Sequence, residues 1–552
     1  MYTPSDVGLP AKFTSFRPGQ AELALAIATD DNRFVLVSAP TGSGKSVTYT
    51  TVAQLVDARV LILTANKGLQ QQLGHDFGAI GLVDIRGMNN YRCVAVDSTG
   101  PLAEYGKPGM SCDEGPCHLK IECPLRQAGC LYYDAVSRAS SARLVVTNYA
   151  YWMTMGRYGN PDALGEFDML VLDEAHEAPD QLADFCAIRL RHDEVRSIIG
   201  ESIPPIDEDI ETWIDWAKLA TEKCREVWID AARDYSLART GNERRSAARY
   251  LKTVADLGSR LKELSNAHKW MRSEPSDPNA WVPGTATDWV AEKTNDGALF
   301  SPVWAHAYAE DYLFRRIPRV VLASATLQKR TAVYLGIPDA AMSWREVKSS
   351  FDPRRRPLIY IPTTTVDRNM TEGQVRMWVN RVDSIIAGRL DRKGIIHTRS
   401  YDRMNLLFAR SKYRHLMLTH TSQNARDVVE KFKRAATPCI LVSPSMEEGY
   451  DFPHDYCRYQ ILAKVPFVDS RSPVIKARAK SDKTYLNYLT TLSIIQQVGR
   501  GMRAEDDWCE NFIIDDHIEW FWPAAKKLMP NWFRSAYRVE QTVPKPPAMK
   551  AA

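Results

Sequence analysis

The sequence lacks long hydrophobic runs and has almost no excess of one charge. No apolar stretch approaches the roughly 18 residues that a membrane span needs, so we expect no membrane partner. The opening residues, MYTPSDVGLPAKF, have neither the basic region nor the apolar stretch of a secretion signal, which predicts a cytoplasmic protein. The net charge of +4, from 71 basic and 67 acidic residues, neither favours nor excludes a nucleic-acid partner, because a strand held in an internal groove needs only local positive charge.

Short β-branched runs alternate with helical patterns along most of the chain and predict an α/β fold with parallel sheets. A chain of 552 residues is too long for one core, and the runs fall into two sets, so we expect two such lobes. In the first lobe the expected strands are 34–37, 60–63, 144–146, 169–172 and 320–323. In the second lobe they are 394–396, 439–442, 459–462 and 512–514.

Residues 186–300 separate the two sets and contain no run of this kind. Trp, Ala, Arg and Glu recur there at helical spacing, most clearly in 211–232 and 244–264, which predicts a helical insertion into the first lobe. Prolines and a glycine within 273–284 indicate a loop inside this insertion. The proline-rich end of the chain, 544–552, is expected to be disordered.

The segment 39–46, APTGSGKS, has the spacing of a phosphate-binding loop, except that Ala39 stands where the first glycine is usual. Its backbone amides can curl around a phosphate because the glycines admit unusual dihedral angles. Lys45 would reach the β- and γ-phosphates of ATP, and the Ser46 hydroxyl would bind Mg²⁺. Upstream, Gln20 could contact the adenine edge through its amide, or belong to an ordinary solvated turn. The expected ATP-binding residues are Arg17, Gln20, Ala39, Pro40, Thr41, Gly42, Ser43, Gly44, Lys45 and Ser46.

An acidic pair directly follows the expected strand 169–172. Asp173 can hold Mg²⁺ through its water shell, and Glu174 can orient and deprotonate an attacking water. Such a pair is common on protein surfaces, but together with a phosphate-binding loop it predicts a site for ATP hydrolysis.

The segment 496–503, QQVGRGMR, places Gln496, Gly499, Arg500 and Arg503 near one face of a helix in the second lobe. Two guanidiniums presented by another lobe suit the γ-phosphate of a bound nucleotide, whereas a basic surface helix is the plainer alternative. The expected catalytic residues are Glu174, Asp173, Lys45, Arg500, Arg503 and Gln496.

Taken in order, these and further motifs resemble superfamily 2 helicases and, within them, the XPD/DinG family of iron–sulfur DNA helicases with a DEAH box. The resemblance covers nearly the whole chain. The sequence departs from the family pattern in two ways. Tyr149 stands where histidine is usual, and the chain is short for a DinG-type enzyme, with no nuclease domain visible. The further motifs are 63–67, 87–93, 145–149, 173–176, 324–326, 394–398, 448–451 and 464–467.

The resemblance implies two RecA-like motor lobes, with an iron–sulfur insertion and a helical arch insertion in the first. It assigns 1–87, 132–185 and 301–330 to the first lobe, 88–131 to the iron–sulfur domain, 186–300 to the arch and 331–543 to the second lobe. It also implies residues that contact DNA or couple it to ATP. These are Thr64, Asn148, Ser324, Thr326, Thr398, Glu448 and Asp451.

Five of the ten cysteines lie between residues 93 and 130, and such clustering is typical of a metal site. The resemblance favours a 4Fe–4S cluster, which needs four thiolates as ligands. The expected ligands are Cys93, Cys117, Cys123 and Cys130, with Cys112 as the spare thiol. A zinc site that includes His118 is the alternative.

The leading functional hypothesis is an ATP-dependent 5′→3′ DNA helicase that acts as a monomer. It would translocate on single-stranded DNA and unwind duplex DNA that carries a tail, with the cluster domain as a wedge. ATP, Mg²⁺ and the 4Fe–4S cluster are the expected cofactors. An unwindase of RNA–DNA hybrids is a second hypothesis, because these motifs contact mainly the nucleic-acid backbone. A third is an ATPase that clamps nucleic acid for a partner complex.

Overall fold

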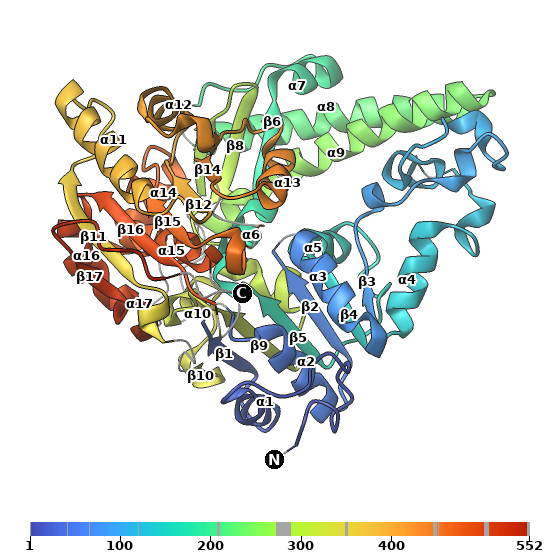
Figure 1. Cartoon of the computed structure of the whole chain (residues 1–552). Helices are drawn as coiled ribbons and strands as arrows, with labels where there is room; N and C mark the ends of the chain where they lie inside the picture. Colours follow the sequence, from blue (N-terminus) through green and yellow to red (C-terminus); the bar gives the residue numbers. More distant parts are fainter. Residues whose placement is uncertain are drawn as a thin grey trace.

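Two parallel sheets, each of seven strands, form the centres of two lobes, and a third, antiparallel sheet supports a helical projection (Figure 1). The computed structural model describes residues 2–40, 42–65, 67–119, 121–206, 210–271, 289–347, 352–444, 450, 452–501 and 507–548. Within these ranges, no helix is both long and apolar enough to cross a membrane. The predicted α/β fold with two parallel-sheet lobes is confirmed.

The sheet of lobe 1 has the strand order β10-β1-β9-β5-β2-β4-β3. Its strands are β1 (Phe34–Ser38), β2 (Val60–Thr64), β3 (Leu82–Asp84), β4 (Leu144–Asn148), β5 (Met169–Asp173), β9 (Arg319–Ser324) and β10 (Met342–Glu346). The helices of this lobe are α1 (Gln20–Ala28), α2 (Lys45–Leu55), α3 (Lys67–Phe77), α4 (Leu131–Ser141), α5 (Tyr149–Arg157), α6 (Ala178–Cys186) and α10 (Lys329–Tyr334).

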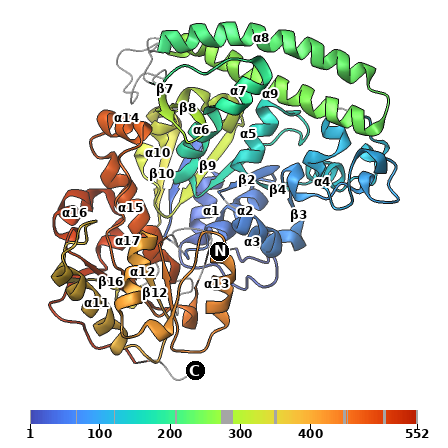
Figure 2. The same cartoon turned by 90° about the horizontal axis from the view of Figure 1, so that it is seen from above.

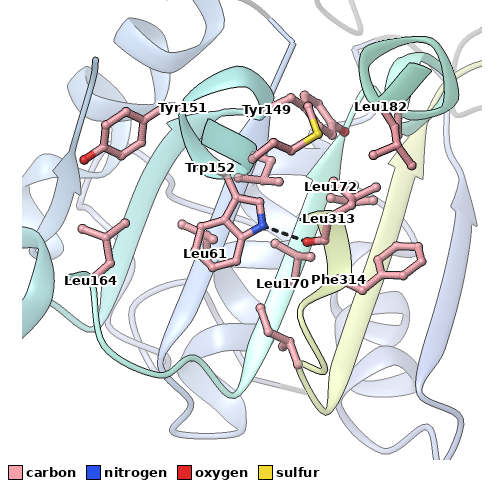
Figure 3. Packing of buried hydrophobic residues seen from close by; sticks show 14 of the residues in the cluster. Leu61, Tyr149, Tyr151, Trp152, Leu164, Leu170, Leu172, Leu182, Leu313 and Phe314 are labelled. Atoms are coloured by element: carbon pink, nitrogen blue, oxygen red, sulfur yellow. Dashed lines mark hydrogen bonds between the residues drawn. The ribbon is translucent and has the colours of Figure 1, made fainter. Parts of the chain in front are cut away.

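Both faces of this sheet are covered, which explains why its strands are continuous apolar runs. In β2, Leu61 belongs to one hydrophobic cluster and Ile62 to the other, because successive side chains of a strand point to opposite faces. On the first of these faces Trp152 of α5 packs among buried side chains, and its indole N–H donates a hydrogen bond of 2.8 Å to the Leu313 carbonyl (Figure 3). The strand ends that carry the motifs are therefore held in a rigid layer.

Lobe 1 extends further along the chain than the expected boundary at residue 330. Strand β10 pairs in parallel with β1, from Phe34 beside Met342 to Ser38 beside Glu346, so it belongs to the first sheet. Its sequence, MSWRE, has no apolar run because β10 is an edge strand with only half-buried side chains. The second lobe begins with β11 (Leu358–Thr364), and its sheet has the order β13-β14-β12-β15-β16-β11-β17.

The remaining elements of lobe 2 complete a second doubly covered sheet. Its other strands are β12 (Gly394–His397), β13 (Met417–Leu418), β14 (Ile440–Ser443), β15 (Tyr459–Leu462), β16 (Glu510–Asp515) and β17 (Tyr537–Val539). Its helices are α11 (Glu372–Ala387), α12 (Tyr401–Arg410), α13 (Ala425–Arg434), α14 (Pro473–Ser481), α15 (Tyr485–Val498), α16 (Ile518–Ala525) and α17 (Asn531–Arg534).

The expected helical insertion is present but contains strands as well. A hairpin of two long helices, α8 (Ile210–Leu237) and α9 (Gly241–Met271), projects from lobe 1, preceded by the short α7 (His192–Ile199) (Figure 2). At its base lie three antiparallel strands in the order β6-β8-β7, with bounds Ile188–Arg191, Gly297–Pro302 and Trp289–Lys293. The prediction that 186–300 has no strands is wrong, because in β6 buried Ile188 and Leu190 alternate with exposed arginines and give no apolar run. The loop expected at 273–284 lies outside the described residues.

The tip of the helical hairpin rests on the cysteine-rich segment, so that the projection forms an arch (Figures 1 and 2). Ala248 of α9 packs against Leu119 and Ile121 of that segment.

The start of the proline-rich tail is also held in place. The carbonyl groups of Pro544 and Pro547 accept hydrogen bonds from Arg389 and Arg392 of lobe 2, although we expected disorder from residue 544 onward.

Candidate active site

The phosphate-binding loop joins the end of β1 to the first turn of α2. Gly42 and Gly44 have φ angles of 74° and 79°, a left-handed conformation that favours glycine. A side chain at Gly44 would also collide with the amide of Gln20, which lies directly behind the loop. The loop leads into the N-terminus of α2, and the free backbone N–H groups at such a helix end attract phosphate.

Gln20 is buried and uses its amide inside the protein. Its Nε2 donates to the carbonyls of Ser43 at 2.9 Å and Gly44 at 3.2 Å, and its Oε1 accepts from the backbone N–H of Arg17 at 2.6 Å. Gln20 thus positions the phosphate loop. The expected contact with the adenine edge stays a prediction.

The two acidic residues of the DEAH motif lie opposite the loop. Asp173 ends β5 and accepts a hydrogen bond of 3.2 Å from the Tyr49 hydroxyl of α2. Glu174 has a φ of 49°, an uncommon left-handed conformation for a non-glycine residue, and its Oε1 lies 3.4 Å from Lys45 Nζ. Backbone strain of this kind persists where a site fixes a side chain, and here it turns the Glu174 carboxylate toward the loop.

The two carboxyl groups have opposite shifts in pKa. Burial, followed by the charge of Glu174, raises the pKa of Asp173 to about 6. Burial also disfavours the charged form of Glu174, but the charge of Lys45 and the hydrogen bond from Ser324 outweigh it and lower the pKa to about 2. Glu174 is therefore ionised at neutral pH, as a group that orients water and accepts its proton must be.

A chain of hydrogen bonds connects Glu174 to lobe 2. The Ser324 hydroxyl donates to Glu174 Oε2 at 3.1 Å and lies 2.8 Å from His176 Nδ1. His176 Nε2 lies 2.9 Å from the side-chain nitrogen of Gln496, which belongs to α15 in lobe 2. Burial lowers the pKa of His176, so its ring is neutral. A neutral ring that accepts from Gln496 at Nε2 carries its proton on Nδ1 and donates it to Ser324.

Two residues of this region were missing from the expected site. His176 is the last residue of the DEAH motif, so the motif itself was a signal for it. Tyr149 replaces the usual histidine, and its buried hydroxyl donates to the carbonyl of Asp173 at 3.1 Å. The substitution therefore links the end of β4 directly to the acidic pair.

A cleft of about 450 Å³ lies between the lobes. Lys45, Ser46, Asp173 and Glu174 line it from lobe 1, and Arg500 from lobe 2. Arg500 also donates to the Tyr450 carbonyl at 3.2 Å. Other lining residues include Arg17, Gly42, Gly44, Thr326 and Gln496. Arg503 and Thr41 lie outside the described residues, so their expected roles stay predictions.

The residues expected to contact DNA or couple it to ATP lie at the ends of strands. Thr64 ends β2, is fully buried and donates to the Thr147 carbonyl at 3.4 Å. Asn148 ends β4 and caps α5 by accepting from the N–H of Tyr151 at 2.8 Å. Thr398 follows β12, is fully buried and donates to the Ser400 carbonyl at 3.2 Å. Glu448 and Asp451 lie outside the described residues.

Thr326 belongs to the same network as Ser324. Its hydroxyl lies 3.2 Å from that of Ser324, and its backbone N–H donates to the same oxygen at 3.2 Å. Both side chains are buried behind the acidic pair. Ser324 and Thr326 are thus linked to each other beside Glu174, and their role in coupling ATP hydrolysis to lobe movement stays a prediction.

The five clustered cysteines meet in one place beside the lobe 1 core. The backbone of Cys93 donates to the Met110 carbonyl at 2.7 Å and that of Cys112 to the Tyr91 carbonyl at 2.8 Å, which brings these two cysteines together. Each of the five thiols interacts electrostatically with at least two others. The five are Cys93, Cys112, Cys117, Cys123 and Cys130.

The thiols differ in their tendency to ionise. A hydrogen bond from Cys112 lowers the pKa of Cys93 to about 6, whereas the same bond and burial raise the pKa of Cys112. Burial raises the pKa of Cys117 to about 11. The Cys112 thiol also lies 3.4 Å from the Arg92 carbonyl. Thiols that repel one another's charge fit a site completed by a cationic metal centre.

Within the described part of the chain, no three His, Cys, Asp or Glu side chains are arranged to hold a metal ion. The side chain of His118 is outside that part. The 4Fe–4S cluster and the zinc alternative therefore both stay predictions, and the donor set of soft thiols suits either.

Two protein families match separate parts of the chain. Residues 13–203 match the family described as "Type III restriction enzyme, res subunit", and residues 387–536 match the family described as "Helicase C-terminal domain". These segments contain the phosphate loop and acidic pair in lobe 1 and the Gln496–Arg500 segment in lobe 2. The second match also covers most of the lobe 2 sheet.

Curated relatives and solved structures give the same assignment. The chain is 20% identical to the ATP-dependent DNA helicase YoaA of Escherichia coli (strain K12), with 93% of each chain aligned. YoaA of Haemophilus influenzae is 25% identical over 31% of this chain and 35% of its own. An XPD helicase structure aligns with a TM-score of 0.59 at 16% identity, over 95% of this chain and 99% of its own. The Xpd4 structure of S. tokodaii gives 0.58 at 14% identity, over 95% and 100%.

The structural likeness at this level of identity establishes the fold. The ordered motifs, the two matching families and the full-length curated relative add the chemistry of the motor. The chain is thus similar to ATP-dependent DNA helicases of the XPD/DinG type along nearly its whole length, and its motor site is that of an ATP-hydrolysing helicase.

Proposed function

We propose that the protein is an ATP-dependent DNA helicase that moves 5′→3′ on single-stranded DNA and unwinds duplex DNA with a single-stranded tail. The observation that carries the motor mechanism is the continuous path from Lys45 through Glu174, Ser324 and His176 to Gln496. It links the hydrolytic carboxylate in one lobe to a helix of the other. A DNA substrate is supported by the name of the aligned relative, ATP-dependent DNA helicase YoaA.

In the proposed hydrolysis, Lys45 and the amides of the loop hold the β- and γ-phosphates, while Ser46 and Asp173 hold Mg²⁺. Glu174 takes the proton of the attacking water. Lys45 now lies 3.4 Å from Glu174, so binding of the phosphates would draw the ammonium group from the carboxylate and raise its proton affinity. Glu174 would thus become a stronger base when ATP is bound.

The hydrogen bonds that connect Glu174 to Gln496 would transmit ATP hydrolysis from lobe 1 to lobe 2. Protonation of Glu174 changes the partner of the Ser324 hydroxyl, and Ser324 is hydrogen-bonded to His176 and through it to Gln496. Arg500 lines the lobe 2 side of the same cleft and would contact the γ-phosphate. The lobes would close on ATP and open after hydrolysis. This cycle would advance the single-stranded DNA past Thr64, Asn148 and Thr398, at the ends of the β-strands.

We further propose that Cys93, Cys117, Cys123 and Cys130 hold a 4Fe–4S cluster, which would cross-link this segment into a rigid wedge beside the strand. The packing of Ala248 against Leu119 and Ile121 supports a closed arch over that strand. The protein is proposed to act as a monomer.

Strand displacement with three substrates tests the function. Duplex DNA with a 5′ tail should be unwound in an ATP-dependent reaction, and duplex DNA with a 3′ tail should not. An RNA–DNA hybrid with a 5′ DNA tail tests the second hypothesis. If the protein unwinds this hybrid in preference to duplex DNA, it is a hybrid unwindase. ATP hydrolysis stimulated by DNA without displacement of any duplex would instead support the nucleic-acid clamp.

A further inference from the structure

An exposed tryptophan lies at the edge of the lobe 2 sheet where the strands end. Trp520 is in the first turn of α16, directly after β16, and 55% of it is exposed. Its ring stacks on that of Phe467, with ring centroids 5.3 Å apart and planes inclined by 4°. Phe467 follows β15, which pairs in parallel with β16, so both aromatic residues leave the sheet at the same edge.

The inner ring of this pair is firmly supported. Phe467 packs edge-on against His517, at 5.6 Å, and against the fully buried Phe521, at 5.8 Å. Lys464 Nζ lies 6.0 Å from the centre of the Phe467 ring. Trp520 therefore rests on a rigid base, while 55% of the residue stays exposed to solvent.

A polar network joins this pair to the predicted strand path at Thr398. Thr398 donates to the Ser400 carbonyl at 3.2 Å, and Arg403 donates to the Ser400 hydroxyl at 3.2 Å. Arg403 and Lys464 both interact with the charge of Asp515, which ends β16. Asp515 in turn lies 2.6 Å from His517 Nδ1, beside the aromatic pair. The loops after β12, β15 and β16 thus form one continuous edge.

We propose that Trp520, supported by Phe467, is a platform on which a base of the bound single strand stacks. Stacking suits a motor, because every base has a flat π-face and the contact does not depend on sequence. This inference rests on the proposed function, in that the bound chain is a single-stranded nucleic acid.

The test compares binding to two oligonucleotides of equal length. One is fluorescently labelled oligodeoxythymidine, and the other is an abasic deoxyribose-phosphate chain that keeps the charges but has no bases. Trp520→Ala should weaken binding of the first by about tenfold, from the known contribution of one stacked base, and leave binding of the second unchanged. Trp520→Phe keeps a flat ring and should restore most of the lost affinity.

A matched control is Tyr456→Ala, since Tyr456 is 43% exposed and precedes β15, at the opposite edge of the lobe 2 sheet from Phe467. It should bind both chains like the wild-type protein. Equal affinity of Trp520→Ala and the wild-type protein for oligodeoxythymidine would overturn the platform. Equal losses on the abasic and the base-containing chain would also overturn it, since stacking cannot act on a chain without bases.

The same measurements separate this inference from the proposed function. The wild-type protein should bind oligodeoxythymidine and hydrolyse ATP faster in its presence. If Trp520→Ala matches the wild-type protein in both measurements, only the platform fails. If the wild-type protein binds neither chain, the helicase function itself fails. Binding of a protein at Trp520 with no effect on oligonucleotide affinity would identify the surface as a docking site and overturn the platform.

Discussion

At the scale of single residues, the phosphate loop and the acidic pair make separable predictions. Lys45→Ala should abolish ATP hydrolysis and weaken nucleotide binding, because the ammonium group holds the β- and γ-phosphates. Glu174→Gln should still bind ATP but not hydrolyse it, because an amide cannot accept the proton of water. Binding of a fluorescent ATP analogue and release of phosphate measure the two steps. Near-normal turnover by Glu174→Gln would show that another group is the base.

Arg500 gives a second prediction at this scale. It lines the cleft from lobe 2, so Arg500→Ala should reduce hydrolysis and leave ATP binding by lobe 1 nearly unchanged. Arginines that reach a nucleotide from another lobe contribute about 10³–10⁵ to the rate in phosphoryl transfer. Single-turnover hydrolysis with saturating ATP isolates this step. A loss below tenfold would count against contact of Arg500 with the γ-phosphate, and Arg503→Ala can be measured in the same way.

At this scale sequence reasoning found residues that line the cleft between the lobes and missed those that act through another residue. Lys45, Asp173 and Glu174 belong to motifs whose spacing reflects their own chemistry. Tyr149 gave no such signal, because its role depends on Asp173, which is adjacent only after folding. The relay through His176 to Gln496 likewise joins lobes that are far apart in the sequence.

At the scale of elements, buried strands were predictable and edge strands were not. Strands β1, β2 and β5 are covered on both faces and therefore have continuous apolar sequences. Strand β10 lies at an edge, and β6 is covered on one face only, so neither has such a run. The boundary between the lobes was consequently predicted too early in the chain, and the strands at the base of the arch were not predicted. The two parallel sheets were predicted correctly.

The cysteine-rich segment provides the prediction that belongs to this scale. Protein purified without oxygen should contain about four irons per chain and absorb in the visible range, as a 4Fe–4S cluster requires. Cys93→Ser, Cys123→Ser and Cys130→Ser should each remove the iron, because a hydroxyl is a poor ligand compared with a thiolate. Unwinding should then fall far more than ATP binding, since the phosphate loop lies in another part of lobe 1.

Cys112→Ser is the matched variant within the same segment. Cys112 is the spare thiol of the predicted ligand set, so we expect its loss to leave the iron content unchanged. Iron loss in Cys112→Ser but not in Cys117→Ser would exchange their roles. Metal analysis that finds one zinc and no iron would refute the cluster and leave the motor assignment intact.

At the scale of the whole molecule, the lobes also meet through an aromatic cluster whose residues do not line the cleft. Trp304 and Tyr334 of lobe 1 stack at 4.1 Å, and Tyr485 of lobe 2 packs edge-on against Trp304 at 5.4 Å. Arg478, buried in α14 of lobe 2, donates to the Val303 carbonyl at 2.6 Å and pairs with Asp180 of α6. None of these residues lines the nucleotide cleft, so the contact can persist while the cleft opens and closes, as a pivot does.

Arg478→Ala should therefore weaken the contact between the lobes without changing either sheet. Removing one partner of a fully buried ion pair costs about 3–5 kcal/mol, but Asp180 is 51% exposed and keeps its hydration, so we expect about 2 kcal/mol. In differential scanning calorimetry we expect the wild-type protein to unfold in one transition and Arg478→Ala in two, the first of them several degrees lower. Arg471→Ala is the control, because Arg471 is in lobe 2 but 83% exposed and pairs only with Asp469 among the described residues. An unchanged single transition in Arg478→Ala would show that the lobes are held together elsewhere, and the pivot would then have to lie at the cleft itself, where Gln496 meets His176.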